Sequence, residues 1–338
     1  MDNAKLIEMR PNQKYLDITW NVSNFCNFKC SYCNPGNYEG TERNDGNLRI
    51  YIDHLKEITD RYREFGYENF KFFFSGGEPT LWRNLVPICE WIRNNLPNSV
   101  IAINTNFSRP LSWWKENGHL FNDVVASFHV EFTDKQRYLR NAMYMYDKLN
   151  YFSCKMLMHE ERFWEVVDFG EMLKKELPNY FIEWTPLYDE INIHAKPWEY
   201  KDPEKAKFLQ EHSVDQHYTV PKPQMTNAFY SQAVWEDGSV TSAYSNEIIV
   251  KRQNFFKGWK CSIGDAIWIN QVGAINMATC GQVPELGNML SDIRKIGPKK
   301  IICNKEHCMC GTDILIPKVN MNKTITIKQV NEEESTAS

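Results

Sequence analysis

The sequence lacks several features that would assign the protein to a broad class. Its net charge is only −4 over 338 residues, so no excess of positive charge would attract it to nucleic acid. No apolar run approaches the roughly 20 residues that span a bilayer, and the first residues show no signal-peptide pattern. Internal repeats are absent as well. We therefore expect a cytoplasmic globular protein of one or two domains, with no membrane or nucleic-acid partner.

Cysteine is the residue type with the most uneven distribution. Eight of the ten cysteines fall in the first tenth and the last quarter of the chain. In a reducing compartment, clustered thiols indicate metal ligation rather than disulfides. The other two are interpreted as small buried apolar residues, since Cys89 lies on an apolar helical stripe and Cys154 lies inside a strand-like run.

The first cysteine group has a spacing that indicates a metal centre with one open position. Cys26, Cys30 and Cys33 fall within eight residues, directly after an apolar strand-like run. A closed zinc site and a fully protein-ligated iron–sulfur cluster each need four ligands. No further cysteine or histidine lies nearby, so we expect a cluster whose remaining iron binds a substrate or cofactor. A zinc knuckle lacking one ligand and three unconnected thiols are the alternative interpretations.

Strand-like runs alternate with amphipathic helical stretches over the first half of the chain. Six such units in succession predict a parallel sheet with helices outside, and the chemistry is then expected at the carboxyl ends of the strands. The cysteine loop follows the first strand, in agreement with that rule. The expected strands are 15–21, 69–74, 100–104, 123–128, 151–158 and 180–187, and the expected helices are 48–65, 81–96, 111–118, 134–149 and 163–177.

A glycine-rich turn follows the second expected strand. Ser75-Gly76-Gly77-Glu78-Pro79 lets the backbone approach a ligand closely, and its proline fixes the exit into the next helix. Together with the cysteine loop, this turn resembles the radical S-adenosylmethionine (SAM) superfamily. The resemblance implies a partial (β/α)6 TIM-type barrel that carries a 4Fe–4S cluster with SAM on its open iron, and the cluster ligands would be Cys26, Cys30 and Cys33.

The resemblance also assigns residues to SAM. In the family, polar groups at later strand ends contact the ribose and carboxylate, and an arginine early in the following helix binds the carboxylate. His129 and Glu131 also reach toward the barrel mouth, where they would contact a substrate or form structural hydrogen bonds. The expected SAM contacts are Tyr32 beside the adenine, the Gly76, Gly77, Glu78 and Pro79 turn at the amino group, Asn106 and Ser127 at the ribose and carboxylate, and Arg137 or Arg140 at the carboxylate.

The last quarter of the chain predicts a second, smaller metal-binding module. Hairpins are expected over 228–241 and 267–277, and the second returns the chain to its start, which brings Cys261 and Cys280 to the same end. The pattern resembles the Twitch domain, the shortened relative of the SPASM domain, and so implies one auxiliary 4Fe–4S cluster. A structural zinc site is the alternative. The expected ligands are Cys261, Cys280 and two of Cys303, Cys308 and Cys310.

The expected fold class is therefore α/β, with the partial barrel followed by a small β-hairpin/α cluster-binding domain. Several prolines loosen the pattern between the two parts, and one short helix is expected there near 203–211. The expected segments are an N-terminal extension over 1–14, the barrel over 15–193, a linker over 194–226, the cluster domain over 227–318, and a strand with a disordered tail over 319–338.

The resemblance implies a reaction type. An electron from a flavodoxin- or ferredoxin-type donor cleaves SAM to a 5′-deoxyadenosyl radical, which takes a hydrogen atom from the substrate. An auxiliary cluster can accept the electron left on the substrate. The leading hypothesis is thus an oxidoreductase that acts on a small polar molecule, such as a sugar, an aminocyclitol or a nucleotide derivative. A barrel that begins near residue 15 leaves no room for an N-terminal peptide-recognition domain, which favours this hypothesis.

Two other hypotheses stay open. One is a peptide- or protein-modifying radical SAM enzyme, of the sulfatase-maturase, thioether or epimerase type. The other is a non-catalytic binding protein that a metal stabilises. The sequence identifies no catalytic acid or base, although Glu183, Tyr188 and Asp189 are candidates because they lie at the end of the last expected strand.

Overall fold

The structure is a computed structural model that describes residues 5–11, 14–43, 46–188, 198–217, 230–293 and 296–322. All ten cysteines lie in these ranges, and all are free thiols. No helix among the described residues is long and apolar enough to cross a membrane.

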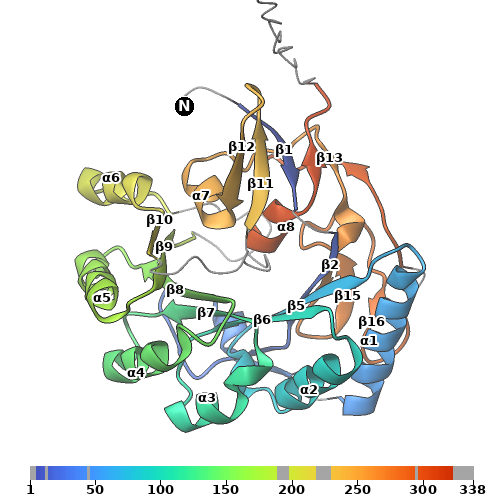
Figure 1. Cartoon of the computed structure of the whole chain (residues 1–338), viewed down its shortest axis with the longest axis horizontal. Coiled ribbons are helices and arrows are strands. Elements are labelled where there is room, and N and C mark those ends of the chain that lie inside the picture. Colours follow the sequence, from blue (N-terminus) through green and yellow to red (C-terminus); the bar gives the residue numbers. More distant parts are fainter. Residues whose placement is uncertain are drawn as a thin grey trace, which may run out of the picture.

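Six parallel strands form the barrel part of the main sheet, which curves around the interior of the molecule (Figure 1). Each strand pairs in parallel with the next one along the chain, and this confirms the predicted α/β partial barrel. The predicted strands agree with the observed ones to within one residue at each end. They are β2 (Tyr15–Asn21), β5 (Asn69–Ser75), β6 (Ser99–Thr105), β7 (Asp123–Phe128), β8 (Tyr151–Met158) and β9 (Tyr180–Pro186).

Five helices cover the outer face of this sheet, as Figure 1 shows. The first of them buries Tyr51, Leu55, Ile58 and Tyr62 along one stripe, and the Asn47 side chain caps its start. The strands are buried on both faces, as is usual for parallel sheets. The helices are α1 (Leu48–Arg63), α2 (Leu85–Asn95), α3 (Leu111–Asn117), α4 (Lys135–Met145) and α5 (Phe163–Glu176). The short 3-10 helices η2 (Pro79–Leu81) and η3 (Gly118–Leu120) accompany α2 and α3.

The cysteine loop lies between β2 and α1 and has its own small sheet. The strands β3 (Ser23–Phe25) and β4 (Glu39–Arg43) are antiparallel, and η1 (Pro35–Asn37) lies between them.

The main sheet is wider than predicted, because strands from outside the barrel segment extend both of its edges. β10 (Val214–His217) pairs with β9, so the expected linker contributes a strand after the predicted helix α6 (Pro203–Glu211). On the other edge, β14 (Ala266–Ile269) pairs in parallel with β2 and is followed by β15 (Ala274–Met277) and β16 (Gly287–Asn288). The second predicted hairpin therefore belongs to the barrel sheet. An open barrel leaves backbone groups unpaired at its edges, and these strands pair with them.

A second, antiparallel sheet lies above the barrel in the view of Figure 1. It contains the first predicted hairpin, and it also contains β1, which lies in the expected N-terminal extension. That expectation needs correction: Leu6 and Met9 of β1 pack with Phe256 and Trp259 in the core of the second module. The expected C-terminal strand and tail cover 319–338, and the part of this segment from residue 323 onward lies outside the described residues. The strand order is β12 (Val240–Tyr244), β11 (Tyr230–Trp235), β1 (Leu6–Arg10), β18 (Lys318–Val319), β13 (Lys260–Cys261) and β17 (Ile301–Ile302).

The second module contacts the barrel at both of its edges. Asn246, on α7 (Ser245–Val250), donates hydrogen bonds to the carbonyl oxygens of Trp184 (3.1 Å) and Ser213 (2.8 Å) at the β9 edge. Thr19 of β2 bonds Thr312 of α8 (Gly311–Leu315) at 3.3 Å. The short helix η4 (Ile263–Asp265) leads into β14. The module thus spans the open side of the barrel.

Candidate functional site

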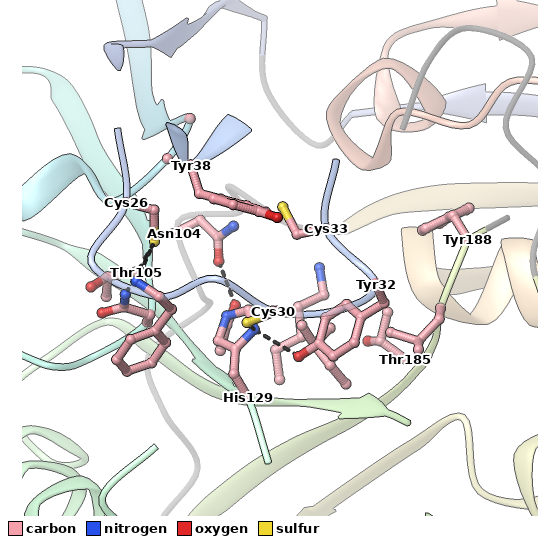
Figure 2. A pocket seen from close by; sticks show the side chains of 18 of the residues that line it. Cys26, Cys30, Tyr32, Cys33, Tyr38, Asn104, Thr105, His129, Thr185 and Tyr188 are labelled. Carbon is pink, nitrogen blue, oxygen red and sulfur yellow. Dashed lines mark hydrogen bonds between the residues drawn. The ribbon is translucent and has the colours of Figure 1, made fainter. Parts of the chain in front are cut away.

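A cavity of about 230 Å³ opens at the carboxyl ends of the barrel strands (Figure 2). It combines the three cysteines of the first group with side chains from β6 to β9 and with the loop after β9. This is where a parallel sheet is expected to place its chemistry. The lining residues are Cys26, Phe28, Cys30, Tyr32, Cys33, Tyr38, Gly76, Gly77, Asn104, Thr105, Asn106, Ser127, His129, Lys155, Leu157, Thr185, Pro186, Leu187 and Tyr188.

The glycine turn positions the cysteine loop through backbone contacts. The Gly77 amide donates to the Ser23 carbonyl, and the Glu78 amide donates to the Phe25 carbonyl, each at 2.8 Å. A Cβ atom on Gly76 would lie 2.5 Å from the Ser23 carbonyl oxygen, and one on Gly77 would lie 2.1 Å from the Phe25 carbonyl oxygen. Gly76 also has a φ of +121°. Glycine is required at both positions because the turn and β3 pack backbone to backbone.

Glu78 anchors the same turn to the end of β6. Its buried carboxylate accepts hydrogen bonds from the Thr80 amide (3.1 Å), the Thr105 hydroxyl (2.8 Å) and the Asn106 amide (2.7 Å). Burial raises the pKa of Glu78, and these bonds oppose that rise. The Glu78 side chain is not among the cavity-lining groups, and Pro79 begins η2 beside it. Glu78 thus joins the two strand ends that carry the glycine turn and Asn106.

The cysteine thiols are held in a partly desolvated environment. Burial raises the pKa of Cys30 to about 12 and that of Cys26 to about 11. The Phe28 amide (3.3 Å) and the Asn106 side-chain amide (3.6 Å) donate to the Cys26 sulfur and oppose the shift. A cluster that binds here must displace the thiol protons, and the two donors would remain to stabilise a thiolate.

His129 joins the cysteine loop to the end of β7. Its Nδ1 lies 2.9 Å from the Tyr32 hydroxyl and 3.4 Å from the Cys30 sulfur, and the Tyr32 and His129 rings are nearly parallel (Figure 2). Burial lowers the pKa of His129 to about 4, so its ring is neutral at pH 7. Glu131 accepts a hydrogen bond from the Ser31 amide at 2.8 Å. His129 and Glu131 therefore hold the cysteine loop in place. Structural hydrogen bonds were one of the two roles that the sequence left open for them, and substrate contact was the other.

The polar residues expected at the SAM ribose and carboxylate have different positions. Asn106 and Ser127 both line the cavity, and Ser127 donates a hydrogen bond to Asn104 at 2.9 Å. Arg137 instead donates to the Ser108 carbonyl oxygen at 3.1 Å and lies 3.6 Å from Asp134. Arg137 and Arg140 are exposed on α4, and neither is among the residues that line the cavity. Arg137 thus contacts the loop that follows β6 without lining the cavity.

Sequence reasoning missed several lining residues, of which Lys155 is the only charged one. Ser153, Lys155 and Leu157 alternate on the inner face of β8, while Cys154 and Met156 pack outward in the main core. The period of two was visible in the sequence, and a lysine inside a buried strand was the available signal. Of the three candidates at the end of β9, Tyr188 lines the cavity. Glu183 accepts from Tyr151 and Ser153 below the cavity, and Asp189 lies outside the described residues.

The second cysteine group gathers between the two sheets from three separate segments. The Gln282 side-chain amide lies 3.3 Å from the Cys280 sulfur and 3.6 Å from the Cys303 sulfur. Burial raises the pKa of Cys261 to about 11, and the nearby Cys303 and Cys280 thiols add to this shift. Burial also raises the pKa of the Cys308 thiol, and the nearby Cys310 and Cys261 thiols add to this rise.

Cys310 differs from the other four in having a hydroxyl and a carboxylate as its main neighbours. Its sulfur lies 3.1 Å from the Thr312 hydroxyl, and the main cause of its raised pKa after burial is Asp313. It also contributes to the raised pKa of Tyr188, which lines the cavity. The second cysteine group therefore adjoins the cavity through Cys310 and Tyr188.

Within the described ranges, no three His, Cys, Asp or Glu side chains meet in an arrangement that could hold a metal ion. The residues nevertheless fit a thiolate-ligated cluster. Three thiols of one short loop line the same cavity: Cys26, Cys30 and Cys33. Among the other described residues that line it, His129 is the one side chain that could be a fourth ligand. His129 is already bonded to Tyr32.

Comparison with known proteins identifies the class. A solved structure described as native anSMEcpe with bound AdoMet covers 82% of this chain and 79% of its own, with a TM-score of 0.50 and 16% identity, which shows a common fold. The sequence model of the radical SAM superfamily matches residues 20–182, a segment that contains the cysteine loop, the glycine turn, four complete barrel strands (β5, β6, β7 and β8) and parts of β2 and β9. Residues 20–182, just under half of the chain, therefore belong to the radical SAM superfamily.

Curated relatives match a shorter segment. GTP 3′,8-cyclase of Pectobacterium atrosepticum is 29% identical over 109 residues, which is 31% of this chain and 32% of that protein. The protein of the same name from Klebsiella pneumoniae is 31% identical over 110 residues, with the same two shares. The match thus spans about a third of the length of these relatives.

Proposed function

We propose that the protein is a radical SAM oxidoreductase that acts on a small polar substrate, of the sugar, aminocyclitol or nucleotide class. The observation that carries the proposal is the cavity itself. Its walls combine the three-cysteine loop, the glycine turn and polar strand ends on one side with Tyr188, which adjoins the second cysteine group, on the other. A second cluster would therefore lie on the Tyr188 side of the cavity, where it could accept an electron from a substrate.

The residues of the chain would bind and orient the cofactors. Cys26, Cys30 and Cys33 would hold the 4Fe–4S cluster, and Asn106 and Ser127 would contact SAM. When bound, the reduced cluster supplies the electron that cleaves SAM and so yields the radical that takes hydrogen from the substrate. An external flavodoxin- or ferredoxin-type protein would deliver that electron. The second module spans the open side of the barrel and would limit the access of water to the cavity.

The second cysteine group would hold one auxiliary 4Fe–4S cluster. We assign Cys261, Cys280, Cys303 and Cys308 as its ligands, because Gln282 contacts two of their sulfurs and Cys261 interacts with the other three. Cys310 is then the spare thiol, on the side of the group that faces Tyr188. In this position the auxiliary cluster would accept the electron left on the substrate, and the net reaction would be a two-electron oxidation.

The likeness to GTP 3′,8-cyclases supports a nucleotide or another small molecule as the substrate class. Those relatives are named for a nucleotide, and the matching third of the chain shares about 30% identity with them.

The deciding experiment is iron and sulfide analysis after anaerobic reconstitution, combined with 5′-deoxyadenosine release under dithionite. Wild-type protein should hold about eight irons, and the Cys26/Cys30/Cys33→Ala variant about four, with no release of 5′-deoxyadenosine. A matched control, Cys89→Ala, removes a buried cysteine of α2 and should leave the iron content unchanged. About four irons in the wild type and none in the triple variant would remove the basis for the oxidation.

Substrate class is tested with deuterated candidates. Transfer of deuterium from a sugar, aminocyclitol or nucleotide into 5′-deoxyadenosine would support the proposal. Transfer only from a peptide would instead identify a peptide-modifying enzyme.

A further inference from the structure

Lys155 gives the cavity a single positive charge. No aspartate, glutamate or arginine is among the described residues that line the cavity, and the His129 ring is already hydrogen-bonded to the Tyr32 hydroxyl. Lys155 is half-buried on the inner face of β8, beside Ser127 of β7 and Glu183 of β9 in the strand register. A ligand in this cavity therefore meets one fixed ammonium group.

The ammonium of Lys155 has no partner among the described residues. It forms no hydrogen bond or ion pair with them, although Glu183 is its register neighbour on β9. The Glu183 carboxylate instead accepts hydrogen bonds from the Tyr151 and Ser153 hydroxyls, one layer deeper in the barrel. Removing a charge from water without a partner is costly, so an unpaired lysine in a cavity wall is most simply explained by a ligand that supplies the opposite charge.

The position of Lys155 in the sheet indicates which bound molecule supplies that charge. The glycine turn at the end of β5, where the amino group of SAM is expected, is separated from β8 by three strand spacings. Three spacings correspond to roughly 14 Å along the sheet. The amino and carboxylate groups of SAM share one carbon atom, so its carboxylate is expected near the β5 turn and Asn106 of β6, and Ser127 of β7 is then left to the ribose. Lys155 lies one strand beyond Ser127, near Thr185 and Leu187.

We propose that Lys155 binds an anionic group of the substrate, a carboxylate or a single phosphate, in the part of the cavity between β8 and β9. This inference rests on the proposed function and narrows it. Among small polar substrates it favours a sugar acid, a sugar phosphate or a nucleoside monophosphate over an aminocyclitol, whose cationic amine would be repelled by the ammonium. One lysine suits one anionic group, since it is a compact point charge with three donors.

The test uses reconstituted protein saturated with SAM and titrated with inorganic phosphate as the probe. The 31P line width of phosphate should broaden with wild-type protein and not with Lys155→Met. The Lys155→Arg variant keeps the charge and should retain the broadening. A matched control is Lys207→Met, which removes an exposed lysine of α6 that pairs with Glu211, and it should behave as wild type. Thermal unfolding of each variant shows whether it is folded.

A second arm separates the substrate from SAM. The dissociation constants of SAM and of decarboxylated SAM, which lacks the carboxylate, are measured by calorimetry for wild type and Lys155→Met. The dissociation constants of SAM and of decarboxylated SAM should each differ by less than about threefold between wild type and Lys155→Met, because the hydrogen bond that the variant loses is to the substrate and not to SAM. A loss of about tenfold or more for SAM alone would place the SAM carboxylate on Lys155 and overturn the proposal.

Equal phosphate broadening in wild type and Lys155→Met would also overturn it. The release of 5′-deoxyadenosine by the wild type in the same preparation reports on the proposed function separately, so the two can fail independently.

Discussion

The two cysteine groups are built in different ways. Cys26, Cys30 and Cys33 belong to one short loop, which backbone hydrogen bonds to the glycine turn hold at the end of β2. The second group combines Cys261 of β13, Cys280 after β15, and a third segment that follows β17. Its frame is the antiparallel sheet that also contains β1, more than 250 residues away from Cys261 along the chain.

This difference teaches that the two sites depend on different parts of the fold. The first site needs close contact between neighbouring strand ends, and its ligands are near one another even in an unfolded chain. The second site forms only when distant strands pair, so the entropy of closing long loops must be offset before its ligands meet. The first site should therefore respond to local changes at the glycine turn, and the second to changes in any of its three segments.

The largest expected effect concerns the second group. Cys303→Ala should remove about four of about eight irons from reconstituted protein, whereas Cys310→Ala should keep all of them, because the Cys310 sulfur lies 3.1 Å from the Thr312 hydroxyl and is the thiol that we assign as spare. Iron analysis and the release of 5′-deoxyadenosine check both variants, and the release should persist in each. An iron loss in Cys310→Ala that matches the loss in Cys303→Ala would show that the assignment of the spare thiol is wrong.

A second prediction sharpens the comparison at the barrel site. Gly77→Ala places a Cβ atom 2.1 Å from the Phe25 carbonyl oxygen, so β3 and the cysteine loop must move. The variant should lose about 3 kcal/mol of unfolding free energy in urea, and it should lose the irons of the first site while the second keeps its own.

Gly118→Ala is the control for this prediction. Its new Cβ atom would meet only the flexible end of the Met145 side chain, at 2.9 Å from Cε. Normal iron content at the first site in Gly77→Ala would show that the backbone contact does not position the loop.

The smallest expected effect depends on pH. Burial lowers the pKa of His129 to about 4, so below pH 6.5 the unfolded chain takes up a proton that the folded chain does not. This contribution destabilises the fold progressively as the pH falls from 6.5 toward 4, and it amounts to about 2 kcal/mol between pH 7 and pH 5. The free energy of unfolding in urea should be measured at pH 7 and pH 5 for both proteins. Its decrease between the two pH values should be smaller in His129→Gln than in wild type, by the amount that the buried histidine contributes. An identical pH dependence in both proteins would mean that the buried ring is not the source.

The barrel strands were predictable because their signals are local. The bounds of β2, β7 and β8 follow from short apolar runs, and the glycine turn and cysteine spacing lie at the strand ends where parallel sheets place their sites. Both C-terminal hairpins were also predictable, since a glycine turn between two apolar runs is a local signal.

Strand pairing between distant segments was not predictable from the same signals. Nothing in the sequence of β14 indicates that it would pair with β2, and nothing in residues 6–10 indicates a place in the second sheet. Backbone hydrogen bonds carry no side-chain signature, so an edge strand accepts any segment that the rest of the fold brings to it.

The sequence by itself determined the six-strand order of the barrel and the two groups of chemically related cysteines, because both depend on spacing along the chain. The tertiary structure decided which charged side chain faces the cavity. The resemblance favoured Arg137 or Arg140 at the SAM carboxylate, but both are exposed on α4 and neither lines the cavity, while the two-residue period of β8 places Lys155 on its inner face. Which face of an element is interior is set by what packs against it, and that is a property of the assembled fold.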